Sequence, residues 1–180
     1  MSKELADARH YPSVAWTDSF SGYVATAAQW WADNVDPRWA EERNEALGLL
    51  AQADELARIV NLVGPEALSP SQRWVLEGAG LLKEGVLQQS ALDEVDSYAS
   101  PQKQFLLLDL ILQIYREGQA LLAEGVPVQQ LQLPVLGRAR RIKGAYDSTQ
   151  IEGLRSFAKE IREEFRRLRI EYGETEKRSS

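Results

Sequence analysis

The 180-residue chain contains no cysteine and a single histidine, His10. Without cysteine no disulfide framework can form, and one histidine gives almost no basis for a cysteine- or histidine-rich metal site. We therefore expect no metal site in this chain. The absence of cysteine is compatible with a cytosolic protein but does not establish that location.

Long apolar segments are also missing. The longest apolar run, residues 105–114, is interrupted by Asp109 and Gln113 and is too short to span a bilayer. No apolar segment of the signal-peptide type follows Met1. The formal net charge of −6 argues against nucleic acid or an anionic membrane as the main partner. We therefore expect neither nucleic-acid binding nor direct membrane insertion.

The common catalytic motifs are absent as well. The sequence contains no GxxxxGK[ST] phosphate-binding loop, and it has no GxGxxG, HExxH or GxSxG pattern. Its acidic residues are spread over predicted helix faces rather than gathered around a nucleophile. We therefore predict no catalytic residue and no independent active site in this chain.

Two charged clusters remain as candidates for chemistry. The acidic cluster consists of Asp93, Glu94 and Asp96. The basic cluster consists of Arg138, Arg140, Arg141 and Lys143. The acidic groups either form a carboxylate site or cap and solvate an irregular turn, and we favour the turn. The basic groups either bind an anion or form a solvated surface, and the acidity of the whole chain favours the surface.

Helical periodicity is what the sequence contains in abundance. Hydrophobic residues make up 44% of the chain, which is typical of a globular protein. Three-and-four spacing and capping signals predict an all-α bundle of about five to seven helices with a protruding helix-loop-helix hairpin. We expect helices over roughly residues 18–35, 36–63, 70–89, 100–124 and 147–172. The bundle would occupy residues 17–172, between an arm at 1–16 and a polar tail at 173–180.

The hairpin is the most sharply defined of these elements. Apolar residues mark one face of the helix over residues 56–63, and Gly64-Pro65 ends it. Ser69 and Gln72 have the spacing of a capping box that restarts the chain as a helix. The loop between them is expected to point outward with Glu66, Ala67 and Leu68. An ordinary helical hairpin without a special role is the alternative interpretation.

The other helices carry further signals. The segment 100–124 is apolar around most of its circumference, so we place it at the centre of the bundle. Three glycines inside the segment 70–89 indicate either close packing of a neighbour or a locally soft helix, and we favour close packing. These glycines are Gly78, Gly80 and Gly85.

The last predicted helix has both a start signal and a seam. Thr149 and Glu152 have the spacing of a capping box. Apolar residues at alternating steps of three and four run from Ile151 to Tyr172, which is a short heptad seam. Such a seam either forms a dimer or docks on its own bundle, and its short length favours docking.

Several short segments occur in a fixed order along the chain: RHYPSVAW (9–16), NVDP (34–37), ERNEAL (42–47), LVGPEAL (62–68), LQQSALDEVDSY (87–98), SPQKQ (100–104) and QLPV (132–135). Their order resembles that of a known family, the C-terminal helical domain of the catalytic A (alpha) subunit of V-type and A-type rotary ATPases. The segments look like the family's RHFPxxNW, NVDPxWxELRDEAL, LVGPDAL, LQQNAFHEVDxY, SPEKQ and ELPV. The resemblance covers almost the whole chain in register.

The resemblance implies two sites. The family's rotor-contact loop falls on Gly64, Pro65, Glu66, Ala67, Leu68, Ser69 and Pro70. Its adenine pocket falls on Tyr11, Gln89, Ala91, Leu92 and Tyr98. Leu92 stands where the family usually has an aromatic residue, and this loss of a ring should weaken stacking on adenine. Glu66 is the only acid at the hairpin tip, so shape and apolar contact would have to transmit torque.

The resemblance also implies a setting for the chain. In the parent complex the cofactors would be ATP or ADP with Mg, but we expect none to bind this chain tightly, because the family's phosphate-binding groups lie in a preceding domain. The partners would be that nucleotide-binding domain, the B subunits and the central stalk subunits. The complex would be cytoplasmic, peripheral to the membrane, and coupled to proton or sodium movement. The alternative is a free-standing, catalytically inert protein-interaction module derived from that domain.

Overall fold

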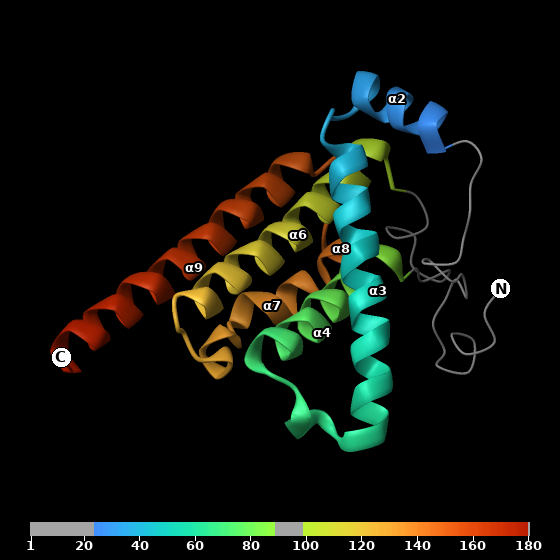
Figure 1. The fold of residues 1–180 in the computed structure, drawn as a ribbon. Helices are drawn as coiled ribbons and strands as arrows, with labels where there is room; N and C mark the ends of the chain where they lie inside the picture. The colour runs from blue at the N-terminus through green and yellow to red at the C-terminus, as the bar shows by residue number, and fades with distance from the viewer. Residues whose placement is uncertain (1–23, 89–98, 180) are drawn as a thin grey trace.

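Figure 1 shows the computed structural model, which describes residues 24–88 and 99–179. Over these ranges the chain forms helices and turns and contains no strand. The α-helices are α2 (Val24–Asn34), α3 (Trp39–Val63), α4 (Pro70–Leu82), α6 (Pro101–Ala123), α7 (Pro134–Ala139), α8 (Ile142–Ala145) and α9 (Ile151–Ser179). Shorter helical turns are η1 (Pro65–Ala67), η2 (Lys83–Leu87) and η3 (Val128–Leu131). The predicted all-α fold is confirmed. The arm at 1–16 lies outside the described ranges.

Helix α6 lies at the centre of the bundle, as its apolar circumference predicts. It packs against α4, α3 and α9. Figure 1 shows α9 running alongside α6 on one side while α3 crosses on the other. Ile111, Leu112 and Ile114 of α6 are fully buried among these neighbours. None of the described helices is long and apolar enough to cross a membrane.

Close packing around α4 and the following turn η2 accounts for two of the three glycines in the segment 70–89. A Cβ atom added to Gly78 would lie 2.6 Å from the ring of Tyr115, and one added to Gly85 would lie 2.9 Å from the carbonyl oxygen of Ala139. At Gly80 a Cβ would lie 3.4 Å from the Arg140 guanidinium, a contact that a flexible side chain can relieve. The predicted close packing is therefore confirmed at two of these positions. The α-helix itself ends at Leu82 and continues as the π-helical turn η2, not as an α-helix to residue 89.

The predicted starts of α4 and α6 are confirmed. The Ser69 hydroxyl accepts from the amide of Gln72 at 3.3 Å, and the Gln72 side chain accepts from the amide of Ser69 at 2.9 Å. Ser100 caps α6 in the same way by accepting from the amide of Lys103 at 3.2 Å. Each cap precedes a proline in the first turn, where the missing N–H carries no cost.

Helix α3 begins later than predicted, at Trp39 rather than near residue 36. The Asp36 carboxylate accepts from the backbone amide of Arg38 at 2.9 Å, and the carbonyl of Asp36 accepts from the amide of Trp39 at 3.2 Å. These bonds form a turn between α2 and α3. The helix therefore starts only after Arg38, which is its N-cap.

The start of α9 also differs from its prediction. Thr149 donates its hydroxyl to the carboxylate of Asp147 at 2.5 Å, and Glu152 pairs with Arg155, so no Thr149–Glu152 capping box forms. Instead the side chain of Gln150 accepts from the amide of Asp147 at 2.9 Å. Asp147 also accepts from the backbone amide of Thr149 at 2.7 Å, so these bonds form a turn that ends just before α9 begins at Ile151.

The seam of α9 docks on its own bundle. Leu154, Ile161 and Phe165 are buried at the contact with α6. The favoured alternative of docking is therefore confirmed for the seam. The helix runs on to Ser179, through residues for which the sequence predicts a polar tail after Tyr172.

Candidate functional site

The predicted hairpin extends beyond the bundle. Figure 1 shows the end of α3 and the turn η1 reaching past α4 and α6. At this end Leu62 and Val63 are 84% and 62% exposed, whereas Leu56, about two turns earlier, is buried. The last turns of α3 therefore carry apolar side chains out of the core and into a position where another surface can contact them.

The turn that follows is held by the backbone and by one arginine. Gly64 has a φ of 88°, a conformation that favours glycine, and its amide donates to the carbonyl oxygen of Val60 at 2.9 Å. The guanidinium of Arg73 donates to the carbonyl oxygens of Leu68 and Glu66 at 3.2 and 3.4 Å. Because both ends of the turn are bonded to the helices they join, the tip is a fixed extension of α3 and α4.

The predicted orientation of the tip is wrong for Leu68. Its side chain is only 4% exposed and belongs to the hydrophobic core, because an apolar side chain at the base of the turn is stabilised by burial. The outward-facing residues of the predicted rotor-contact loop are Pro65, Glu66, Ala67, Ser69 and Pro70, and Gly64 is half-buried. A hollow of about 270 Å³ beside the tip is lined by Pro65, Glu66, Leu68, Arg73 and Leu76.

The predicted adenine-pocket residues lie outside the ranges that the structure describes. These residues are Tyr11, Gln89, Ala91, Leu92 and Tyr98. The acidic cluster at residues 93–96 lies outside them too. Gln88 directly precedes these undescribed residues, and its carbonyl oxygen accepts from the Lys143 ammonium at 3.0 Å. The pocket therefore stays a prediction.

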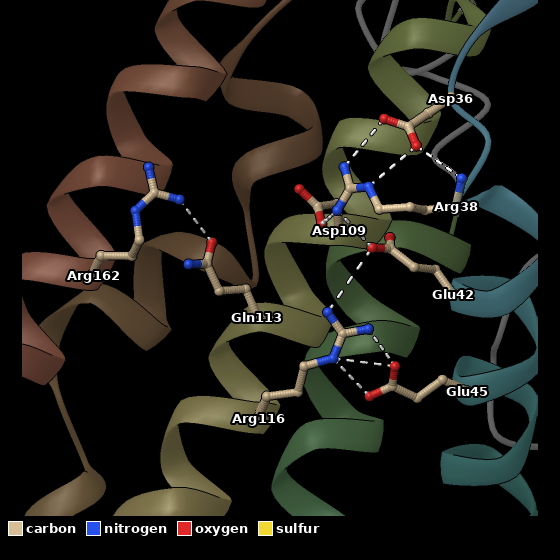
Figure 2. Close-up of polar contacts among 8 residues, drawn as sticks. All are labelled: Asp36, Arg38, Glu42, Glu45, Asp109, Gln113, Arg116 and Arg162. Carbon is tan, nitrogen blue, oxygen red and sulfur yellow. Dashed lines mark hydrogen bonds and ion pairs between the residues drawn. The ribbon is translucent and has the colours of Figure 1, made fainter.

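A charged cluster joins the other end of α3 to α6 (Figure 2). One nitrogen of the Arg38 guanidinium, Nη1, donates to the Asp109 carboxylate at 2.9 Å and to Glu42 Oε1 at 3.2 Å. The other two nitrogens of this guanidinium bind the two oxygens of Asp36 at 3.1 Å each. Arg38 thereby ties the turn before α3, the first turns of α3 and the centre of α6 together.

A second arginine of α6 completes the cluster. Arg116 pairs with Glu45, and its Nη1 lies 3.9 Å from Glu42 Oε1. The pairing with Glu45, although opposed by burial, holds the pKa of Arg116 above its ordinary value. Figure 2 shows both arginines directed toward Glu42 from opposite sides. Glu42 is therefore the centre of the cluster.

Glu42 has an unusual environment for a carboxyl group. It is 2% exposed, and its Oε2 atom has no hydrogen-bond partner. Burial is the main cause that raises the pKa of Glu42 to about 8, the neighbouring Asp109 raises it further, and the charges of Arg38 and Arg116 oppose the rise. For Asp36, by contrast, partial burial is outweighed by bonds from Arg38, which hold its pKa below the ordinary value.

The basic cluster serves mainly to join elements of the fold. Arg140 pairs with Glu77 and Glu84 at 2.6 Å each, and Arg138 pairs with Glu160. The guanidinium of Arg138 also lies over the ring of Phe157, at 4.5 Å. These pairings agree with the favoured surface interpretation. Lys143 does not fit it, because it is only 6% exposed.

Sequence reasoning missed the cluster around Glu42, although a signal was available. Asp109 interrupts an otherwise apolar run on the central helix, and Arg116 follows it by about two helical turns on the same face. Glu42 and Glu45 stand three residues apart and so share a face of α3. Opposite charges at these spacings indicate an ionic contact between two helices.

Comparison with known proteins places these features in a family. The family model for the C-terminal domain of V and A type ATP synthase matches residues 28–132. The chain is 62% identical to the V-type ATP synthase alpha chain of Nitrosococcus oceani over 178 residues, which are 98% of this chain and 30% of that protein. It is 46% identical to the A subunit of the A-type ATP synthase of Ignicoccus hospitalis over 128 residues, or 71% of this chain and 22% of that protein. It is 38% identical to the corresponding protein of Thermococcus sibiricus over 97% of this chain and 29% of that protein.

Proposed function

Because the chain belongs to the family of C-terminal domains of V and A type ATP synthases, we propose that it transmits torque between the central rotor and the nucleotide site of the catalytic chain. The chain spans under a third of the length of the relatives described above. ATP hydrolysis or synthesis, coupled to proton or sodium movement, would therefore be an activity of the assembled enzyme. This domain would lie at the cytoplasmic side, peripheral to the membrane.

The protruding hairpin is the observation that supports this proposal. Its tip extends beyond the core, exposes Leu62 and Val63, and is held to α4 by Arg73. A lever needs a stiff body and a tip that contacts its partner. The exposed apolar side chains suit a partner of the central stalk that is recognised by shape and apolar contact, in agreement with the single acidic residue at the tip.

The proposal can be tested in the assembled enzyme that contains the complete catalytic chain. We expect Leu62→Ser together with Val63→Ser to reduce ATP-driven ion pumping several-fold more than it reduces ATP hydrolysis. Ile170→Ser is the control, because Ile170 is likewise an exposed apolar residue, at 50%, but lies on α9, away from the hairpin. Equal pumping by the tip variant and the wild type would contradict a role of this tip in torque transfer.

The second part of the proposal concerns adenine. Tyr11, Gln89, Ala91, Leu92 and Tyr98 would form one wall of the nucleotide pocket, with ATP or ADP and Mg held largely by the preceding nucleotide-binding domain and neighbouring B subunits. Family membership supports this assignment. The isolated 180-residue chain should hydrolyse no ATP and bind it at most weakly, and submicromolar binding measured by calorimetry would count against the proposal.

A substitution at Leu92 tests the pocket directly. Stacking on an aromatic ring is worth roughly 1–3 kcal/mol per base, so Leu92→Phe should lower the KM for ATP of the complete enzyme, by about tenfold for a gain of about 1.4 kcal/mol. Tyr98→Leu removes a ring and should raise the KM. If neither substitution changes the KM for ATP, these residues do not contact adenine.

A further inference from the structure

Glu42 is a buried polar group that the proposed function leaves unexplained. It lies in the first turns of α3, is 2% exposed, and leaves Oε2 without a hydrogen-bond partner. A buried carboxylate oxygen without a donor is costly, because it loses its hydration and gains nothing in return. A protonated carboxyl group removes this cost, since it carries no charge and its O–H can donate to an acceptor.

An acceptor for such a proton is present on the facing helix. Nη1 of Arg38 is 3.2 Å from Glu42 Oε1 and 2.9 Å from Asp109 Oδ1, so the two carboxyl groups meet at one nitrogen atom (Figure 2). When both are ionised neither can donate to the other. With one proton between them, Glu42 can donate to Asp109 while Arg38 donates to both.

The charges around Glu42 also favour a proton on its carboxyl group. The groups that face it are Arg38 before α3 and Asp109 and Arg116 on α6, and these two arginines are also engaged by Asp36 and Glu45. Four carboxyl groups thus share two guanidinium groups. Such an excess of acid favours uptake of a proton at its most buried member. Among the described residues no group of three or more carboxyl or imidazole side chains converges as metal ligands would.

We propose that Glu42 and Asp109 form a proton-binding acid pair, which holds one shared proton near neutral pH and thereby fastens α3 to α6. Loss of the proton places two carboxylates against each other at this contact and loosens it. The effect is expected in the first turns of α3, where Glu42 meets α6. The pair depends only on contacts within this chain, so it stands or falls independently of the proposed function.

Infrared titration of the full 180-residue chain tests the proton. The wild type should show the carbonyl band of a buried protonated carboxyl group at pH 7, and this band should disappear with a midpoint near pH 8. Glu42→Gln should abolish the band, and Asp109→Asn should move its midpoint to lower pH. Glu45→Gln is the control, because Glu45 is more exposed and belongs to the same cluster, and its band should stay. Absence of the band in the wild type at pH 7 overturns the proposal.

Hydrogen exchange tests the coupling to α3. Glutamine is close in shape to a protonated glutamic acid and stays neutral at every pH. At pH 8.5 the amides of α3 should therefore be several-fold better protected in Glu42→Gln than in the wild type, whereas at pH 6 the two should agree. Equal protection at pH 8.5 would show that the proton does not fasten the helix. Should Glu42→Gln fail to fold, Asp109→Asn gives the same comparison, because it also removes the repulsion.

Discussion

The two ends of α3 differ in the chemistry of their side chains and in the exposure of those side chains. Near its start, Glu42 is buried among charged groups from α6 and from the preceding turn. At its end, Leu62 and Val63 are apolar and face solvent. The usual distribution places charges outside and apolar groups inside, so both ends depart from it in opposite directions.

We call the start of α3, which is bonded to α6, its held end, and the part with exposed Leu62 and Val63 its free end. The ion pairs and hydrogen bonds around Glu42 fix one arrangement of α3 on α6, because any displacement of one helix breaks a pairing with the other. An exposed apolar surface is satisfied only when another surface covers it. One helix thus combines a start that is bonded to α6 with an exposed apolar end, and the proposed transmission of torque would need both.

The largest expected change in stability comes from comparing a buried residue of the hairpin with an exposed one. Leu68→Ala removes a core side chain, and we expect it to lower the free energy of unfolding by about 2–5 kcal/mol. Leu62→Ala, with the same change in chemistry at an 84% exposed position, should change it by no more than about 0.5 kcal/mol. Urea denaturation of the two variants measures both. Similar losses for both would mean that the end of α3 is not free.

The sequence alone predicts the elements that depend on local signals. The capping box at Ser69, the end of α3 at Gly64 and the start of α6 at Ser100 each follow from a few neighbouring residues, and each is confirmed. The central position of α6 follows from its apolar circumference. Such features are predictable because their energy arises within one turn or one face of a helix.

The features that the sequence does not predict depend on a distant partner. Leu68 is buried because the base of the turn meets the core, and its position in a loop gives no sign of that. Glu42 lies near Asp109 only after α3 crosses α6. Thr149 donates to the carboxylate of Asp147 instead of forming a capping box with Glu152, which pairs with Arg155. Local patterns admit both outcomes in each case.

The pH dependence of stability tests the held end. The folded-state pKa of Glu42 is raised from 4.5 to about 8, so between these values the folded chain binds more protons than the unfolded chain. The contribution of this bound proton to the free energy of unfolding is fully present below pH 4.5 and is lost as the pH rises through 8. The free energy of unfolding should therefore fall across this window, by no more than about 1.4 kcal/mol per pH unit for one proton. Urea denaturation at several pH values should show this slope in the wild type and a flatter one in Glu42→Gln, and equal slopes would contradict the assignment to Glu42.

The smallest of these effects concerns the cap that joins the free end to the bundle. Ser69→Ala removes the hydroxyl that accepts from the Gln72 amide, and it leaves the reciprocal bond from the Gln72 side chain in place. We expect a loss of about 1 kcal/mol in the free energy of unfolding. Ser71→Ala is the control, since Ser71 is exposed in the first turn of α4 and does not cap the helix. If the tip is a rigid extension, Ser69→Ala should also increase hydrogen exchange in η1 and the first turn of α4 while the amides near Glu42 keep their protection. Loss of protection at both ends of α3 would instead mean that the helix responds as one unit, and that the held and free ends are not energetically separate.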